Sequence, residues 1–281
     1  MNVAVLMTCH NRRETTLRCL ESLACAVRVI REKEEAGRDR PRWRLFVVDD
    51  GSTDGTGEAI REYAEKVKGL GEGEHWGEIH LIRGDGTLYW AKGMALAWNE
   101  ALRYEERVSS SAPAFDSFLW LNDDTILRPD ALLRLLRSSA QNRDAVVAGS
   151  LIDESAGSKT CGVVAGGLFT GNFVLIPRSV YEKVGLICGR FHHAWADSDY
   201  ARHCQKEGVE IVELEGVGTT REHDLRPSLK GVSIGGRIRL LFDPKGWCVH
   251  DLWLYRKRNW GLCVAIASSL HLIFHVLKGE R

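Results

Sequence analysis

The feature that most constrains this chain is an alternation of short apolar runs with longer amphipathic stretches over its first half. Four apolar runs are short enough to be buried strands: 3–8, 44–49, 79–82 and 118–121. Stretches typical of helices stand between and after them, at 56–67, at 91–103 and from residue 129 onward. Strands that alternate with helices favour right-handed βαβ units. We therefore predict an α/β fold with a Rossmann-like open sheet that is mostly parallel.

The region after residue 145 differs from the first half. Its expected strands are shorter, around Gly149, around Val163 and at 172–176, and one helix is expected around 199–207. This pattern predicts a second, smaller sheet region beside the main one.

Charge and cysteine usage limit the classes of partner and compartment. The formal net charge of the 281 residues is zero, so no nucleic-acid partner is expected. Residues 221–281 are basic, with 11 Lys and Arg against 5 Asp and Glu, and could face phosphates or an anionic membrane surface. The eight cysteines form no C-x-x-C pair, and no export signal is recognisable, so we expect a reducing cytoplasm.

Three polar clusters follow the predicted strands, at 8–11, 49–54 and 122–125. Ligands of open α/β sheets bind at the carboxyl ends of the strands. A carboxylate in the second cluster could accept a hydrogen bond from the ring N–H of uracil or thymine, or from ribose hydroxyls. A turn followed by a helix cap explains the same residues and stays open. Neither G-x-G-x-x-G nor a P-loop pattern is present, which disfavours those two kinds of nucleotide site.

The third cluster, Asn122-Asp123-Asp124, follows a very apolar run. Adjacent carboxylates at the end of a buried strand are costly unless a cation neutralises them. Oxygen ligands of this kind suit Mg²⁺ or Mn²⁺. A helix N-terminus before Pro129 is the alternative interpretation.

A later cluster, 192–202, contains Asp197 and Asp199 beside aromatic residues, where a carboxylate could act as a general base. Asp199 could instead cap the helix that follows it. His192 and His193 raise the question of zinc. No set of Cys and His residues stands near them in the sequence, so we do not expect a zinc site there.

Taken together, these motifs resemble the family 2 glycosyltransferases of GT-A fold over about residues 1–215. The resemblance rests on the order of four segments, which is specific although each segment alone is not: Met7-Thr-Cys-His-Asn11, Val48-Asp-Asp-Gly-Ser-Thr-Asp-Gly-Thr56, Trp120-Leu-Asn-Asp-Asp124 and Ala196-Asp197-Ser-Asp199. Two positions depart from the family pattern, with Asn122 at the first D-x-D position and Ala196 in place of the Glu that precedes the catalytic Asp.

The resemblance implies a role for individual residues. Asp197 would be the catalytic base, and Asp124 would bind Mn²⁺ or Mg²⁺. Asp50 would contact the pyrimidine. Further nucleotide-binding residues would be Thr8, His10, Asn11, Gly93 and Asp123. The family often adds a late histidine to the metal, for which His223 is the candidate we name and His250 the alternative. Lys245 could approach the diphosphate or lie in a solvated turn.

The implied activity is inverting transfer of a hexose or deoxyhexose from a UDP or dTDP sugar to a hydroxyl group. The acceptor would be a carbohydrate or a lipid-linked glycan, in polysaccharide or glycoconjugate synthesis. The alternatives are a sugar nucleotidyltransferase and a non-catalytic nucleotide-sugar-binding protein, the latter supported by Asn122 and Ala196.

The same resemblance divides the chain. Residues 1–225 would form the GT-A domain, with a nucleotide-sugar half (1–128) and an acceptor and catalytic half (129–225). Residues 226–281 would be a basic, aromatic extension. Its residues Trp253, Tyr255 and Trp260 alternate with basic ones, which suits contact with the inner face of a membrane. A packed C-terminal helix with a solvated basic turn is the other interpretation.

Overall fold

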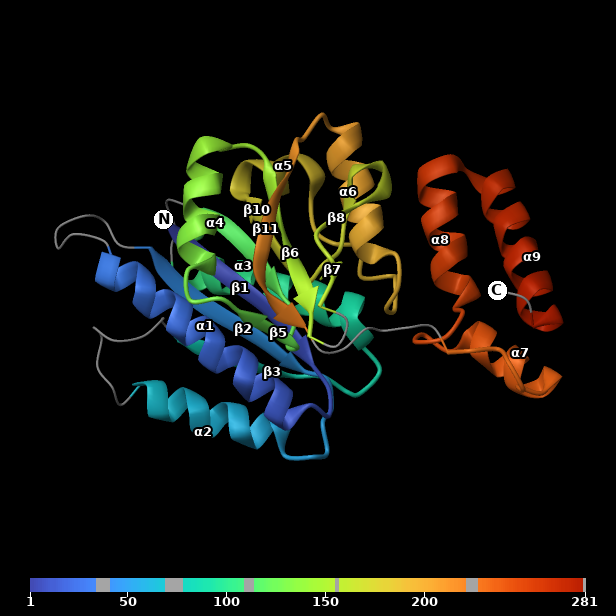
Figure 1. Ribbon diagram of the computed structural model, residues 1–281, viewed down its shortest axis with the longest axis horizontal. Helices are drawn as coiled ribbons and strands as arrows, with labels where there is room; N and C mark the ends of the chain where they lie inside the picture. Colours follow the sequence, from blue (N-terminus) through green and yellow to red (C-terminus); the bar gives the residue numbers. More distant parts are fainter. Residues whose placement is uncertain (34–40, 69–77, 109–113, 155–156, 221–226, 280–281) are drawn as a thin grey trace.

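The centre of the protein is a long, curled sheet with helices on both faces (Figure 1). The computed structural model describes residues 1–33, 41–68, 78–108, 114–154, 157–220 and 227–279. Within these ranges the strand order is β3-β2-β1-β4-β10-β6-β11-β5, and β7 pairs with β6. Strands β3, β2, β1 and β4 are parallel, as are β6 and β11, whereas β10 is inserted antiparallel between β4 and β6. The prediction of an open, mostly parallel α/β sheet is confirmed.

The strands of this sheet lie close to the predicted positions in the first half. They are β1 Asn2–Cys9, β2 Arg42–Asp49, β3 Ile79–Arg83, β4 Ser117–Leu121, β5 Thr125–Leu127, β6 Val146–Asp153, β7 Lys159–Thr160, β10 Phe173–Pro177 and β11 Ile211–Thr220. A separate small sheet pairs β8 (Val163–Val164) with β9 (Leu168–Phe169) around the short helix η1 (Ala165–Gly167). A small second sheet is therefore present, as predicted, and contains the strand expected around Val163. The strands expected around Gly149 and at 172–176 are β6 and β10 of the main sheet.

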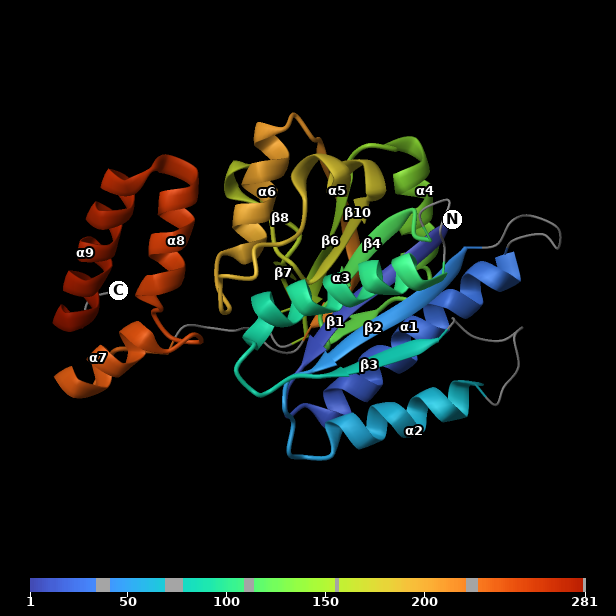
Figure 2. The ribbon, with the colours of Figure 1, turned by 180° about the vertical axis from the view of Figure 1, so that it is seen from behind.

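Two layers of helices bury the two faces of the sheet. Helices α1 (Arg13–Lys33), α2 (Thr56–Lys68) and α4 (Ala131–Gln141) lie on one side. Helices α3 (Tyr89–Val108), α5 (Arg178–Val184) and α6 (Ala196–Lys206) lie on the other (Figure 2). Strand β1 shows why both layers form, because its side chains alternate between two apolar clusters, with Val5 in one and Leu6 in the other. In the central strands β1, β4 and β10 the interior positions are apolar, and polar residues such as Asn2, Thr8 and Ser117 stand at the strand ends.

The C-terminal helices α7 (Ile234–Phe242), α8 (Val249–Trp260) and α9 (Leu262–Lys278) pack beside α6. Helices α8 and α9 form a hairpin at Gly261, whose φ of 90° favours glycine. Tyr255 is buried and its ring stacks on that of Trp195 at 4.8 Å between centroids, so this aromatic residue faces the protein and is not available to a membrane. In the described ranges, no helix combines the length and apolar character that crossing a membrane requires.

Candidate active site

The carboxyl ends of three neighbouring strands bring the predicted polar clusters together. Strands β2, β1 and β4 are adjacent in the sheet, and Cys9 at the end of β1 is in register with Asp49 at the end of β2. The chain segments that leave these ends are 10–12, 50–55 and 122–124. Because parallel strands end at the same edge, the three clusters share one edge of the sheet, as the sequence predicts.

The loop after β1 is joined to the loop after β2 by short hydrogen bonds. His10 Nδ1 lies 2.6 Å from the backbone oxygen of Asp50, and the backbone N–H of Asn11 donates to Ser52 Oγ at 2.9 Å. The side-chain oxygen of Asn11 accepts from the backbone N–H of Thr53 at 2.8 Å. His10 and Asn11 are exposed at the rim of the edge, where both could contact a ligand.

Asp50 is buried, and its carboxylate already binds the start of α3. One oxygen accepts from the backbone N–H of Gly86 at 2.8 Å, and the other accepts from Leu88 and Tyr89 at 3.0 and 2.9 Å. The contact of Asp50 with a pyrimidine stays a prediction. The structure gives this residue a second role that sequence reasoning did not find, which is to hold the 86–89 loop.

Gly93 and Thr8 meet where α3 crosses β1. A Cβ atom at Gly93 would lie 2.3 Å from Thr8 Oγ1, so a side chain here would push the helix away from the strand. This close packing accounts for the glycine, and its place along a donor stays a prediction. The turn-and-cap interpretation of the second cluster is correct for Asp54, which accepts from the backbone N–H groups of Thr56 and Arg13 at 3.0 and 3.1 Å.

Asp123 and Asp124 are buried side by side after β4, with exposures of 5% and 7%. Arg12 Nη1 lies 3.1 Å from an oxygen of Asp123 and 3.3 Å from an oxygen of Asp124. Burial raises the pKa of Asp123 to about 7 even though Arg12 lowers it. Sequence reasoning did not single out Arg12, although its place just after the first cluster was the available signal.

A tryptophan connects Asn122, the residue before the carboxylate pair, to the predicted catalytic base. Trp90 Nε1 donates to Asn122 Oδ1 at 2.7 Å. The indole packs directly on Gly171, where an added Cβ would lie 2.3 Å from Trp90 Cζ2. The backbone N–H of Gly171 in turn donates to Asp197 Oδ2 at 3.1 Å. These contacts place Asn122, Trp90, Gly171 and Asp197 in one continuous group.

Asp197 lies half-buried in the first turn of α6. Burial raises its pKa, while the backbone N–H groups of Ser198 and Gly171 oppose the shift. Burial also raises the pKa of Cys161, and the negative charges of Asp124 and Asp197 add to that effect, so both carboxylates lie near the same thiol. The structure therefore brings the metal motif and the predicted base to one region.

Asp199 belongs to a different part of the structure. It is 2% exposed, and both of its oxygens accept from Arg258 Nε, at 3.1 and 2.9 Å, while Asn259 donates to one of them at 2.9 Å. The helix starts at Ala196, so Asp199 is not the residue before it. Its role is to bind α6 to α8.

The comparisons with known proteins now decide the family. The Glycosyl transferase family 2 model matches residues 4–192. The chain belongs to glycosyltransferase family 2. It is therefore a glycosyltransferase, and no curated protein matches it in sequence.

Solved structures show the same fold at low identity. S. aureus TarS 1-349 in complex with UDP matches with a TM-score of 0.58 and 11% identity, over 99% of this chain and 70% of that chain. The complex of TarS 1-349 with UDP-GlcNAc matches with a TM-score of 0.56 and 10% identity, over 99% and 91% of the two chains. The glycosyltransferase shares the GT-A fold with these proteins.

The histidines named as late metal ligands do not join Asp124 in the described residues. His223 lies outside those residues. His250 is at the start of α8, with its Nδ1 atom 3.0 Å from an oxygen of Asp251, among the C-terminal helices. Lys245 is exposed in the turn before α8, which agrees with the solvated-turn interpretation.

Proposed function

We propose that this glycosyltransferase moves a hexose or deoxyhexose from a UDP or dTDP sugar to an acceptor hydroxyl, with inversion at the anomeric carbon. The observation that carries the proposal is the continuous contact from Asn122 through Trp90 and Gly171 to Asp197. This contact supports the proposal because it joins a carboxylate of raised pKa to Asn122, in one of the polar clusters for which we propose donor binding.

Asp197 is the proposed general base. Its carboxylate takes the proton of the acceptor hydroxyl as that oxygen forms a bond to the anomeric carbon. The bond from this carbon to the diphosphate oxygen breaks on the opposite face, so the configuration inverts in one step. A raised pKa makes the carboxylate a stronger base than an ordinary Asp at neutral pH. Because the N–H of Gly171 binds one oxygen, the carboxylate is oriented before the acceptor arrives.

Asp123 and Asp124 fit a divalent cation such as Mn²⁺ or Mg²⁺. Two adjacent buried carboxylates share one guanidinium, and burial still raises the pKa of Asp123. Their hard oxygen atoms are the ligand type that these ions prefer. Such an ion, with Asp124 as its ligand, would supply Lewis-acid stabilisation of the diphosphate leaving group.

We favour a uridine nucleotide as the carrier of the donor sugar. His10 and Asn11 are exposed beside Thr8 and Asp50, and ring N–H and carbonyl groups of a pyrimidine can pair with such polar groups. The TarS complexes with UDP and UDP-GlcNAc support this choice, because the same fold holds those nucleotides there.

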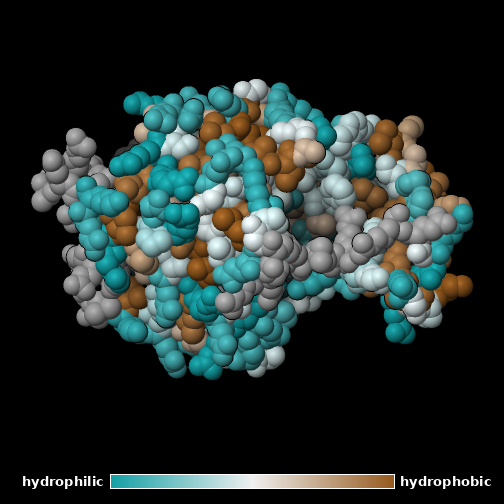
Figure 3. All heavy atoms as spheres, viewed as in Figure 1, coloured by the Kyte–Doolittle hydropathy of each residue, from teal (hydrophilic) through white to brown (hydrophobic). Residues whose placement is uncertain are grey.

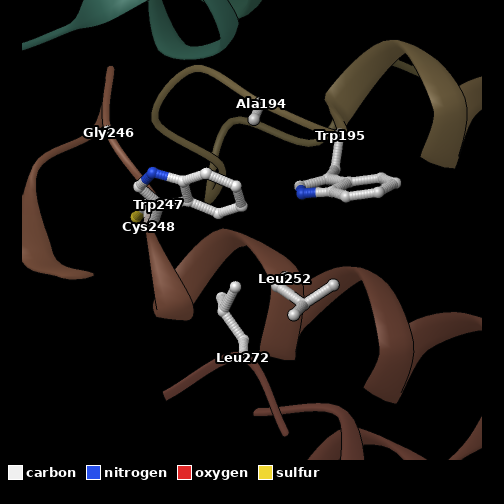
Figure 4. A pocket seen from close by; sticks show the side chains of 7 residues that line it. All are labelled: Ala194, Trp195, Gly246, Trp247, Cys248, Leu252 and Leu272. Atoms are coloured by element: carbon white, nitrogen blue, oxygen red, sulfur yellow. The ribbon is translucent and has the colours of Figure 1, made fainter. Parts of the chain in front are cut away.

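A small pocket lies beside Trp195, where residues 194–195 meet residues 246–248 and the C-terminal helices. Figure 4 shows the indoles of Trp195 and Trp247 on either side of it, with Leu252 and Leu272 below. Aromatic rings pack well against the C–H faces of sugar rings, because both surfaces are flat and apolar. Trp195 stands two residues before Asp197, so we propose that its partly exposed ring, and not the interior of the pocket, contacts the acceptor sugar.

We also propose that the C-terminal helices bring the enzyme to the cytoplasmic face of a membrane, where a lipid-linked acceptor would be found. Hydrophobic side chains are exposed on these helices (Figure 3): Ile234, Ile238 and Phe242 on α7, and Leu262, Ile266, Leu270 and Phe274 on α9. Arg237 and Arg239 stand among the exposed residues of α7, and Lys278 follows those of α9, which favours an anionic surface. On this view residues 1–225 are the catalytic domain and 226–281 the membrane-facing extension. Flotation with anionic liposomes tests the idea, and failure to float at low salt would end it.

A donor screen tests the proposed activity. UDP, dTDP and GDP sugars are added with Mn²⁺, and thermal stabilisation is measured, because a ligand raises apparent stability by mass action. We expect UDP or dTDP sugars to stabilise the protein only with the cation. The stereochemistry of the product is then read by NMR. Stabilisation by none of the donors, or a retained configuration, would contradict the proposal.

A further inference from the structure

Outside the active site, a cluster of metal-binding side chains joins the 192–195 loop to the start of α8. A nitrogen of His192, the sulfur of Cys248 and a carboxylate oxygen of Asp251 all lie within 4.8 Å of one another. His192 is 59 positions from Asp251 in the sequence, which is why no metal pattern is visible there. The sequence shows no matching set of Cys and His residues near His192, whereas the fold brings Cys248 and Asp251 beside it.

A fourth potential ligand points to the same place. His192 Nδ1 and His250 Nδ1 each lie 3.0 Å from the same atom, Asp251 Oδ1. The two imidazole rings are 4.9 Å apart between centroids. One imidazole, one carboxylate and one thiol therefore form a close group, and the His250 ring adjoins it through Asp251 Oδ1.

The second oxygen of Asp251 is held by the backbone. Asp251 is fully buried, and its Oδ2 atom accepts from the N–H groups of His192 and His193 at 3.2 and 3.0 Å. Hydrogen bonds of this kind fix the orientation of a metal-binding carboxylate. The N–H of His192 also lies 3.2 Å from Oδ1, the oxygen that faces the two imidazoles.

We propose that His192, Cys248 and Asp251 bind Zn²⁺ at a site separate from the nucleotide-sugar site, and that the adjacent His250 supplies the fourth ligand. A thiolate, two imidazoles and one carboxylate are the ligand types that Zn²⁺ takes in four-coordinate structural sites, whereas Mn²⁺ and Mg²⁺ prefer oxygen ligands alone. Ligand atoms around zinc lie roughly 3–4 Å apart, given bonds of about 2.0–2.3 Å. The observed separations are close to this arrangement.

The site would brace the loop that carries the proposed base. Residues 192–195 lead directly into α6 and Asp197. The backbone oxygen of His192 also accepts from the N–H of Ala91, next to Trp90. An ion at this position would therefore fix α8, the loop and the start of α3 to one another.

Metal content and cobalt spectroscopy of the full chain test the site. Protein purified without chelator is analysed for zinc, and the metal-depleted protein is titrated with Co²⁺. We expect about one zinc ion per chain and a thiolate-to-cobalt absorption band. Cys248→Ser should lose the band and bind zinc at least about tenfold more weakly, and the matched variant Cys263→Ser, at an exposed cysteine, should keep both.

Each outcome decides the question. Absence of zinc and of the band in the unaltered protein would overturn the proposal, as would an unchanged band in Cys248→Ser. If Cys248→Ser does not fold, the variant His250→Ala is tested instead. It should weaken zinc binding while the thiolate-to-cobalt band persists, and an unchanged zinc affinity would remove His250 from the site. Asp124→Ala separates this proposal from the proposed function, because it should keep zinc and lose Mn²⁺-dependent donor binding.

Discussion

Replacing Gly171 by alanine should disturb the group of residues on which the proposed mechanism depends. The new Cβ atom would lie 2.3 and 2.4 Å from two carbons of the Trp90 indole. Carbon atoms pack at about 3.5–4.0 Å, so Trp90 or the 171 backbone must move by roughly 1 Å. Because the N–H of Gly171 binds Asp197, a backbone shift also displaces the proposed base.

The close contact between residue 171 and Trp90 sets the expected size of the loss in stability and in rate. Overpacking of a close-packed site costs about 1–3 kcal/mol of stability. A displacement of about 1 Å at a catalytic group can reduce the rate roughly 10²-fold. Trp90→Phe provides a smaller ring. Gly171→Ala should therefore reduce stability less in a protein that also carries Trp90→Phe. The coupling between the two changes should reach about 0.5–3 kcal/mol.

Urea unfolding and turnover of the two single variants and the double variant measure this coupling. Gly235→Ala is the matched control, because an added Cβ at Gly235 in α7 meets nothing within 4 Å and alanine favours the helix. The reasoning is refuted if Gly171→Ala behaves like Gly235→Ala, or if Trp90→Phe does not reduce its cost.

Three further predictions concern the other contacts of the site. Asp124→Ala should abolish divalent-cation-dependent donor binding with the fold intact, and isothermal titration with Mn²⁺ and donor checks it; unchanged affinity would remove the metal role. Arg258→Ala leaves the buried charge of Asp199 without its main partner and should lower the free energy of unfolding by about 3 kcal/mol. Urea unfolding measures this loss, and a loss below about 1 kcal/mol would contradict the proposed link between α6 and α8. Because burial raises the pKa of Asp197, protonation of this carboxylate should lower kcat/KM at a pH above the ~3.9 at which an ordinary Asp titrates. A kcat/KM that stays constant down to about pH 4 would contradict a raised pKa.

The sequence predicts the first half of the fold well because its information there is local. Each buried strand is one apolar run, and the polar residues that follow it, such as Asp50 and Asp124, mark the strand end directly. The long strand β11 was not predicted, because its residues alternate charged, small and apolar types without one clear period.

The connections within the site could not be predicted, because they join residues that are distant in the chain. The bond between Trp90 and Asn122 spans 32 positions, and Arg12 lies 111 positions before Asp123. A tryptophan beside a helix start or an arginine after a strand has many ordinary roles. Only the folded structure shows that these side chains meet at one edge of the sheet.

The second carboxylate of the 192–202 cluster illustrates the same limit. Asp197 and Asp199 stand two positions apart and look equivalent in sequence. The structure separates them, because one points to Gly171 and the other to Arg258.

The central claim is that Asp197 is the general base, and the variant Asp197→Asn tests it most directly. The change preserves the size of the side chain and removes its basic oxygen. Turnover and donor binding are measured in parallel on the same preparation. A positioned general base contributes roughly 10²–10⁴-fold to the rate, so turnover should fall by about that factor while donor affinity is kept. Near-normal turnover, or an equal loss of donor binding, would contradict the assignment.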